Sequence, residues 1–108
     1  MVLIVNRYLI SGRFVGLTIY PFVILKEETL KTDQVFLNHE SIHLRQQLEM
    51  GILPFFVWYS VEFIIRYLRT GNAYTAYRAI SFEQEAYTEE SNGAYLQERK
   101  FWAFLRFI

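Results

Sequence analysis

The sequence predicts an α+β domain in which a small antiparallel sheet is followed by a helical core. Two observations carry this prediction. Short segments rich in β-branched and aromatic residues come first, and longer segments with helix start and stop signals follow. Because 108 residues suffice for one hydrophobic core, we expect a single domain spanning residues 1–108.

The strand signals lie at residues 2–5, 14–20 and 22–25. Ser11-Gly12 and Pro21 separate them, since both are typical turn positions. We therefore expect three short strands that form an antiparallel sheet.

A long helix is predicted next, between Thr32 or Asp33, which can cap its start, and Gly51, which can end it. Apolar residues recur along this segment at helical spacing, so the helix should be largely buried. They form two stripes: Val35, Ile42 and Met50 on one, and Leu37, Leu44 and Leu48 on the other.

His39 and His43 are the only two histidines of the chain, and they stand four residues apart in the string His39-Glu40-Ser41-Ile42-His43. On a helix they share one face, so both imidazoles can reach one Zn²⁺, while Glu40 points along a neighbouring edge. A carboxylate in that place can take a proton from metal-bound water. The pattern predicts a zinc-dependent hydrolase; the other interpretation is two helical histidines that serve packing alone.

A catalytic zinc takes three protein ligands and keeps one position open for water. The chain has no cysteine and no third histidine, so the third ligand should be a carboxylate or, less often, a tyrosine or amide. Ser81 and Gln84 have the spacing of a capping box, which predicts a helix with Glu83 in its first turn. Glu85 points to a different face and is the alternative ligand.

With these residues the chain resembles the gluzincin superfamily of metallopeptidases, in which HExxH is followed by a glutamate ligand on a later helix. The stretches that match are His39-Glu40-Ser41-Ile42-His43 and Glu83-Gln84-Glu85-Ala86. In size the chain resembles the minigluzincins. The resemblance implies zinc bound by His39, His43 and Glu83, with Glu40 as the general base.

The resemblance also implies a peptide substrate that pairs with an edge strand, which residues 16–24 could supply. The chain departs from the family at Tyr87, where many members carry an aspartate that orients a histidine. Tyr87 could instead hydrogen-bond an imidazole or a developing oxyanion. The alternative function is a non-catalytic membrane-peripheral or interaction protein, whose structural or vestigial metal site Glu85 or Tyr87 would close.

The formal net charge is zero and no Lys/Arg cluster occurs, so nucleic acid is not expected as a partner. The apolar run at the N-terminus is too short for a signal peptide, which favours a cytoplasmic location. Aromatic residues make up 19% of the chain, more than so small a core needs. We therefore expect peripheral membrane contact or a homo-oligomer.

Two aromatic-rich segments could supply that contact. Residues 52–68 predict an amphipathic helix, buried or facing a membrane and too short in its apolar run to span one, with Glu62 and Arg66 as an ordinary ion pair. Residues 95–108 predict a helix that covers the core or lies on a bilayer. The N-terminal segment or the last residues, 101–108, could also lie across the open metal position and keep an enzyme latent.

Overall fold

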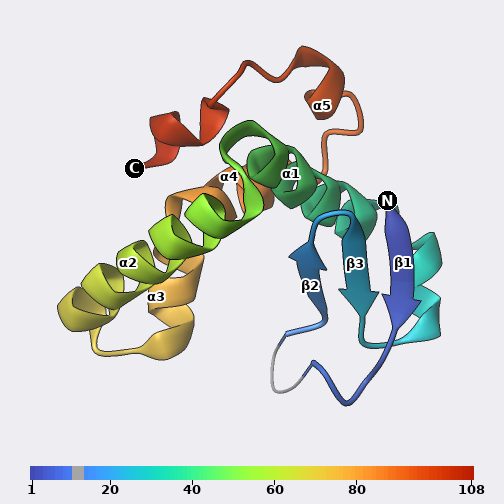
Figure 1. Cartoon of the computed structure of the whole chain (residues 1–108), viewed down its shortest axis with the longest axis horizontal. Coiled ribbons are helices and arrows are strands. Elements are labelled where there is room, and N and C mark those ends of the chain that lie inside the picture. Colours follow the sequence, from blue (N-terminus) through green and yellow to red (C-terminus); the bar gives the residue numbers. More distant parts are fainter. Residues whose placement is uncertain (11–13) are drawn as a thin grey trace.

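A computed structural model of the chain describes residues 1–10 and 14–108, and it confirms the α+β class. A small sheet packs on one side of helix α1, and the remaining helices lie around its other end (Figure 1). The predicted turn at Ser11-Gly12 lies outside the described residues.

The described residues form a three-stranded sheet of β1 (Val2–Val5), β2 (Gly16–Ile19) and β3 (Phe22–Leu25), in the order β1-β3-β2. β2 and β3 are an antiparallel hairpin, but β1 runs parallel to β3, so the prediction of an antiparallel sheet is wrong for β1. The buried residues Val23 and Leu25 of β3 pack on α1, and the strand that carries them takes the centre of the sheet. Local strand signals carry no information about this order.

Helix α1 (Gln34–Met50) begins and ends as predicted. The Asp33 side chain accepts a hydrogen bond from the Phe36 N–H (3.0 Å), and Gly51 ends the helix with a positive φ of 88°. The two predicted apolar stripes are wrong at Val35 and Leu48, which are exposed. The buried face of α1 is instead strongly polar: it includes His39, Glu40, His43, Gln46 and Gln47.

Helix α2 (Ile52–Thr70) is bent away from α1 by 111°, and α3 (Ala73–Ala79) and α4 (Ser81–Glu89) follow. Glu83 lies in the first turn of α4 as expected, but the predicted capping box is wrong. The Ser81 N–H and Oγ donate to Glu62 of α2, at 3.0 and 2.5 Å. Glu62 is therefore more than the partner of Arg66, at 3.8 Å, because it is buried and holds the start of α4.

The predicted helix over residues 95–108 is wrong as a single element. It is divided into α5 (Tyr95–Glu98) and a 3₁₀ turn, η2 (Ala103–Phe107); another 3₁₀ segment, η1 (Glu28–Thr32), precedes α1. Between α5 and η2, the buried Arg99 side chain pairs with Glu85 and Glu49, and the Trp102 N–H donates to Glu49. These long-range bonds stabilise the chain more than a continuous helix over residues 95–108 would. Phe104 is fully buried against Phe82, so this residue covers the core as one alternative predicted.

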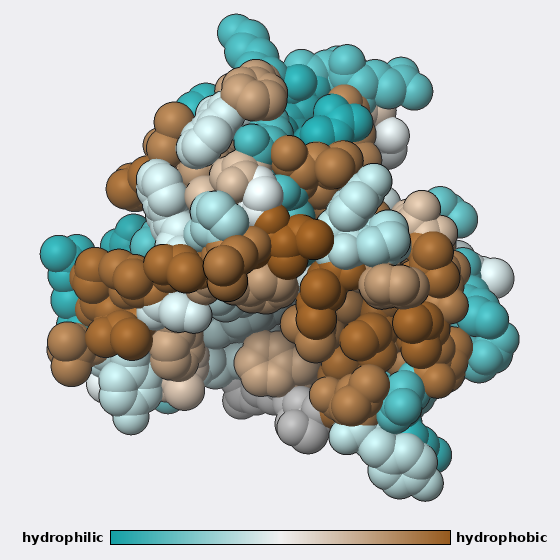
Figure 2. All heavy atoms as spheres, in the orientation of Figure 1, coloured by the Kyte–Doolittle hydropathy of each residue, from teal (hydrophilic) through white to brown (hydrophobic). Residues whose placement is uncertain are grey.

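Apolar side chains also cover much of one face of the molecule, over α2 and over the outer side of the sheet (Figure 2). Those exposed on α2 include Leu53, Val57, Val61, Ile64 and Leu68, and those on the sheet include Val2, Ile4, Ile19 and Phe22. Within the described ranges, no helix on its own has the length and apolar character to cross a membrane. Only α1 and α2 taken together, as a bent pair, have that length and apolar character.

Candidate metal centre

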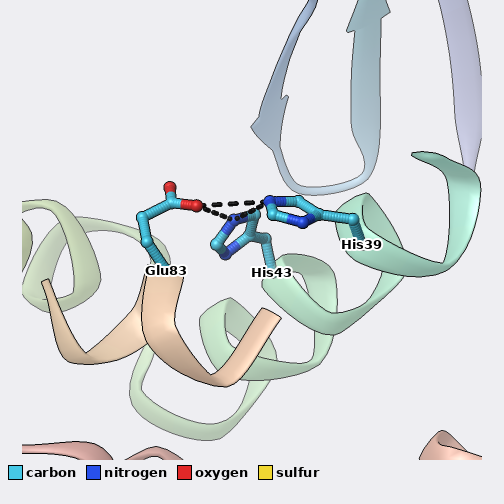
Figure 3. Close-up of side chains that lie close together, drawn as sticks. All are labelled: His39, His43 and Glu83. Atoms are coloured by element: carbon cyan, nitrogen blue, oxygen red, sulfur yellow. Dashed lines mark hydrogen bonds and ion pairs between the residues drawn. The ribbon is translucent and has the colours of Figure 1, made fainter. Parts of the chain in front are cut away.

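The side chains of His39, His43 and Glu83 point toward one another from α1 and α4 (Figure 3). The two Nε2 atoms are 3.2 Å apart, and Glu83 Oε1 lies 3.2 Å from His39 Nε2 and 3.0 Å from His43 Nε2. All three residues are buried. Helical spacing brings the histidines together, and the first turn of α4 supplies the carboxylate.

These distances fit a tetrahedral zinc ion. Bonds of 2.0 to 2.1 Å at tetrahedral angles place any two donor atoms roughly 3.4 Å apart. The three measured separations, 3.0 to 3.2 Å, are close to that value. Two imidazoles and one carboxylate are also a donor set of catalytic zinc sites, which keep the fourth position for water.

Hydrogen bonds on the far side of each ring fix the tautomers that a metal needs. His39 Nδ1 lies 2.9 Å from Glu90 Oε2, and a carboxylate only accepts, so Nδ1 is the donor. His43 Nδ1 lies 2.8 Å from Gln46 Oε1, which is likewise an acceptor. Each Nε2 is therefore the ring nitrogen that a metal would bind, and both Nε2 atoms meet Glu83 Oε1 at one point.

The electrostatics of the site agree with this arrangement. Burial lowers the pKa of His43, but the facing Glu83 carboxylate more than offsets it and raises that pKa to about 9. Burial raises the pKa of Glu83, yet the two histidines hold it well below its usual range. The cluster thus favours positive charge at its centre, and a metal ion would supply that charge in place of a proton.

Tyr59 of α2 orients the Glu83 carboxylate. Its hydroxyl donates to Glu83 Oε2 at 2.7 Å, which leaves Oε1 to face the histidines. Burial and the neighbouring Glu83 raise the pKa of Tyr59 above its usual value, so the hydroxyl stays protonated and remains a donor.

Glu40 is buried beside the cluster and lies outside it, as the sequence predicts for a base that is not a ligand. Its Oε2 accepts a hydrogen bond from the Thr18 hydroxyl of β2. β2 approaches α1 very closely here: a Cβ on Gly16 would lie 2.5 Å from the Phe36 ring and 2.9 Å from Glu40 Oε1. Only glycine fits this crossing without displacing a neighbour.

A cavity of about 620 Å³ opens in front of the cluster. Its metal end is polar, with His39, His43, Glu40 and Glu83, whereas the rest is largely aromatic and aliphatic. The apolar lining includes Leu9, Ile10, Phe14, Leu17, Phe55, Phe56, Phe63 and Ala73. A smaller cavity of about 230 Å³ shares His39 and Glu40 and extends toward Asp33 and Glu90.

No residue of the fully described segment 95–108 lines either cavity. Trp102 and Phe104 pack instead in the core cluster with Phe82. The expectation that residues 101–108 lie across the metal position is therefore wrong, because Trp102 and Phe104 pack into the core and hold this segment away from both cavities.

The structure separates the two candidate glutamates. Glu83 joins the histidines, whereas Glu85 turns away and binds Arg99, Tyr95 and Gln46. Tyr87 packs its ring on His39, 4.5 Å between ring centres, and its hydroxyl pairs with Tyr77. The predicted hydrogen bond from an imidazole to Tyr87 is absent among the described contacts, because Glu90 accepts from His39 Nδ1 instead.

Sequence reasoning missed Gln46, Glu90, Tyr59 and Thr18 as partners of the site. Two of them could have been found from their spacing in the sequence. Gln46 stands three residues after His43, and Glu90 stands seven residues, or about two helical turns, after Glu83. Tyr59 and Thr18 depend on how α2 and β2 pack, which no local spacing indicates.

Comparisons of the chain with protein-family models, with curated proteins and with solved structures found no match.

Proposed function

We propose that the protein is a zinc-dependent hydrolase that cleaves peptide bonds. The observation that carries this proposal is the convergence of His39 Nε2, His43 Nε2 and Glu83 Oε1 within 3.0 to 3.2 Å of one another, with Glu40 beside them. Bound Zn²⁺ would activate a water molecule and polarise the scissile carbonyl. The peptide substrate follows from the gluzincin resemblance and from the cleft.

Glu40 is the general base in this proposal. Its carboxylate takes a proton from the attacking water and passes it to the leaving nitrogen. The Thr18 hydroxyl holds Oε2, which leaves Oε1 on the side of Gly16 and the cleft. Because Glu40 lies outside the ligand set, its substitution should separate metal binding from turnover.

The edge strand β2 supports a peptide as substrate. The Lys26 N–H donates to Val15 O, so antiparallel alternation turns the backbone groups of Gly16 and Thr18 away from β3. Gln47 occupies the far end of this edge through Thr18 O and Tyr20 N, both at 2.7 Å. The Gly16 end remains beside Glu40, where an extended peptide can pair with it.

The cleft favours a substrate with a bulky apolar side chain near the scissile bond. Its volume of about 620 Å³ is within the range of ligand pockets, and aromatic side chains from α2 dominate its wall. Apolar burial there would contribute binding energy, whereas a charged side chain would lose its hydration.

A digest of a peptide library with and without 1,10-phenanthroline tests the function. We expect metal-dependent cleavage, with bulky apolar residues next to the cut. Glu40→Gln should keep the fold and the zinc but lose roughly 10²- to 10⁴-fold in activity. Glu28→Gln, a change at an exposed glutamate, is the matched control. Cleavage that survives in Glu40→Gln, or a zinc-loaded wild type that cleaves no peptide of the library, would contradict the proposal.

The second candidate function is the non-catalytic one, a membrane-peripheral or interaction protein, and the exposed apolar face over α2 and the sheet favours it. A structural zinc site would need a fourth protein ligand. In the part of the chain that the structure describes, no further carboxylate joins the two histidines and Glu83, and Glu85 and Tyr87 are engaged elsewhere. A zinc ion held by these three residues would keep a position for water, which favours the hydrolase.

A further inference from the structure

A continuous row of buried polar side chains connects the C-terminal segment to His43. It consists of Arg99, Glu85 and Gln46, and none of the three side chains is exposed to solvent. The row lies behind the metal ligands, on the side away from the cleft, and the hydrolytic reaction as proposed makes no use of it.

The amide of Gln46 can take only one orientation in this row. Its nitrogen lies 3.1 Å from the Phe82 carbonyl and 3.0 Å from Glu85 Oε1, and both of these atoms only accept. The amide oxygen must therefore face His43 Nδ1, at 2.8 Å, and that nitrogen must carry the proton. The other ring nitrogen, Nε2, is thereby left free for a metal.

Glu85 holds this orientation in place because it is itself fixed by donors. Arg99 binds it through Nε at 2.5 Å and Nη2 at 3.1 Å, and the Tyr95 hydroxyl donates at 2.7 Å. Arg99 also pairs with Glu49 of α1 at 2.6 Å. Burying charges is costly, and Arg99 offsets that cost by pairing with a carboxylate oxygen of each glutamate.

We propose that Gln46 is a positioning residue for the metal ligand His43, locked by Glu85 and, through it, by Arg99 of the C-terminal segment. A segment that never touches the metal thus sets the tautomer of one ligand. The proposal rests on metal binding by the three ligands of the proposed function but does not depend on hydrolysis.

Two adjacent glutamines provide a matched pair of variants. Gln46 and Gln47 are both buried on α1, but Gln46 serves His43 and Gln47 serves β2. We expect Gln46→Met to weaken zinc binding roughly 10- to 100-fold, the usual cost of losing the hydrogen-bond partner of a ligand. Gln47→Met should leave zinc affinity close to wild type. Chelator competition measures both, and circular dichroism checks the fold.

Glu85→Gln tests how Glu85 fixes the Gln46 amide, and it leaves both His43 and Gln46 unsubstituted. The new amide must offer its oxygen to Arg99 Nε and Tyr95 and its nitrogen to the side that faces Gln46. Two amide nitrogens would then face each other, and a turned Gln46 amide would set its oxygen against the Phe82 carbonyl. Neither orientation satisfies the Gln46 amide, so its hold on His43 should weaken. We expect weaker Zn²⁺ and Co²⁺ binding and a visible Co²⁺ spectrum of changed intensity, whereas a merely structural role would lower stability and leave the spectrum unchanged.

The outcomes separate this proposal from the function it rests on. A wild type that binds no zinc overturns both. A wild type that binds zinc while Gln46→Met binds it equally well, or no worse than Gln47→Met, overturns the positioning role alone. If Gln46→Met does not fold, Glu85→Gln decides, and an unchanged zinc affinity and Co²⁺ spectrum there overturn the proposal.

Discussion

The two sides of the metal centre are built from opposite chemistry. Behind the ligands, every charged or amide group is buried against a fixed partner, as in the pairs Arg99–Glu85 and Gln46–His43. In front of them, the cavity is walled by aromatic and aliphatic side chains such as Phe55 and Phe63. Directional hydrogen bonds fix the orientation of the His39, His43 and Glu83 side chains, whereas apolar contacts in the cleft fix no orientation of a bound molecule.

The largest effect is expected from removing Arg99, the cation at the centre of the polar network behind the ligands. Arg99→Met would leave Glu85 and Glu49 buried without their cation, at a cost of about 3 to 5 kcal/mol in the free energy of unfolding. Arg69→Met, at an exposed position of α2, is the control and should change stability by less than about 0.5 kcal/mol. Urea denaturation measures both; equal midpoints would show that the network contributes no stability.

The boundary between the two sides can be tested at Gly16. A methyl group there meets the Phe36 ring and Glu40, so Gly16→Ala should cost about 1 to 3 kcal/mol and reduce activity by displacing the base. Gly93→Ala, where an added Cβ meets nothing within 4 Å, is the matched control. Should both variants melt at the same temperature, the close crossing of β2 and α1 would be refuted.

The cleft in front of the ligands can be filled without disturbing the polar network behind them. Ala73 lines the cleft at the start of α3, and Ala73→Trp should lower kcat/KM for peptides with bulky apolar side chains roughly tenfold or more while zinc affinity stays constant. Ala94→Trp, at an exposed position outside the cavity, is the control. Peptide kinetics give the answer, and an unaffected preference for apolar residues would place the specificity elsewhere.

The smallest effect on stability is expected at the exposed apolar face over α2 and the sheet. If the protein contacts membranes or associates with itself, we expect this face to make the contact. We expect the wild type to float with liposomes and the double variant Leu53→Lys/Val57→Lys to lose flotation, with a change in stability below about 0.5 kcal/mol. Glu28→Lys/Thr29→Lys adds the same groups at exposed positions of η1 and should still float. A wild type that elutes as a monomer and never floats rules out both forms of contact.

The parts of the molecule that depend on local spacing could be predicted from sequence. The bounds of α1 follow from Asp33 and Gly51, and the meeting of His39 with His43 follows from helical periodicity. Glu83 was found through the helix start near Ser81, although Glu62 of α2 supplies the actual cap. The prediction succeeded there because any cap at that place leaves Glu83 in the first turn.

The remaining features depend on partners far apart in the chain. The parallel pairing of β1 with β3 requires that β2 form at the opposite edge, and no residue in β1 indicates that order. The break between α5 and η2 depends on Arg99 reaching Glu49, fifty residues earlier. Helical propensity favoured one continuous helix, but the satisfaction of buried charges prevailed.

Gln47 also affects whether the edge of β2 can pair with other molecules of the protein. An unpaired strand edge that accepts a peptide can equally accept the same edge of another molecule and begin an aggregate. By bonding Thr18 O and Tyr20 N, the Gln47 side chain closes part of that edge with an amide from its own chain. The opening that remains is the Gly16 end, where the proposed peptide substrate would pair beside Glu40.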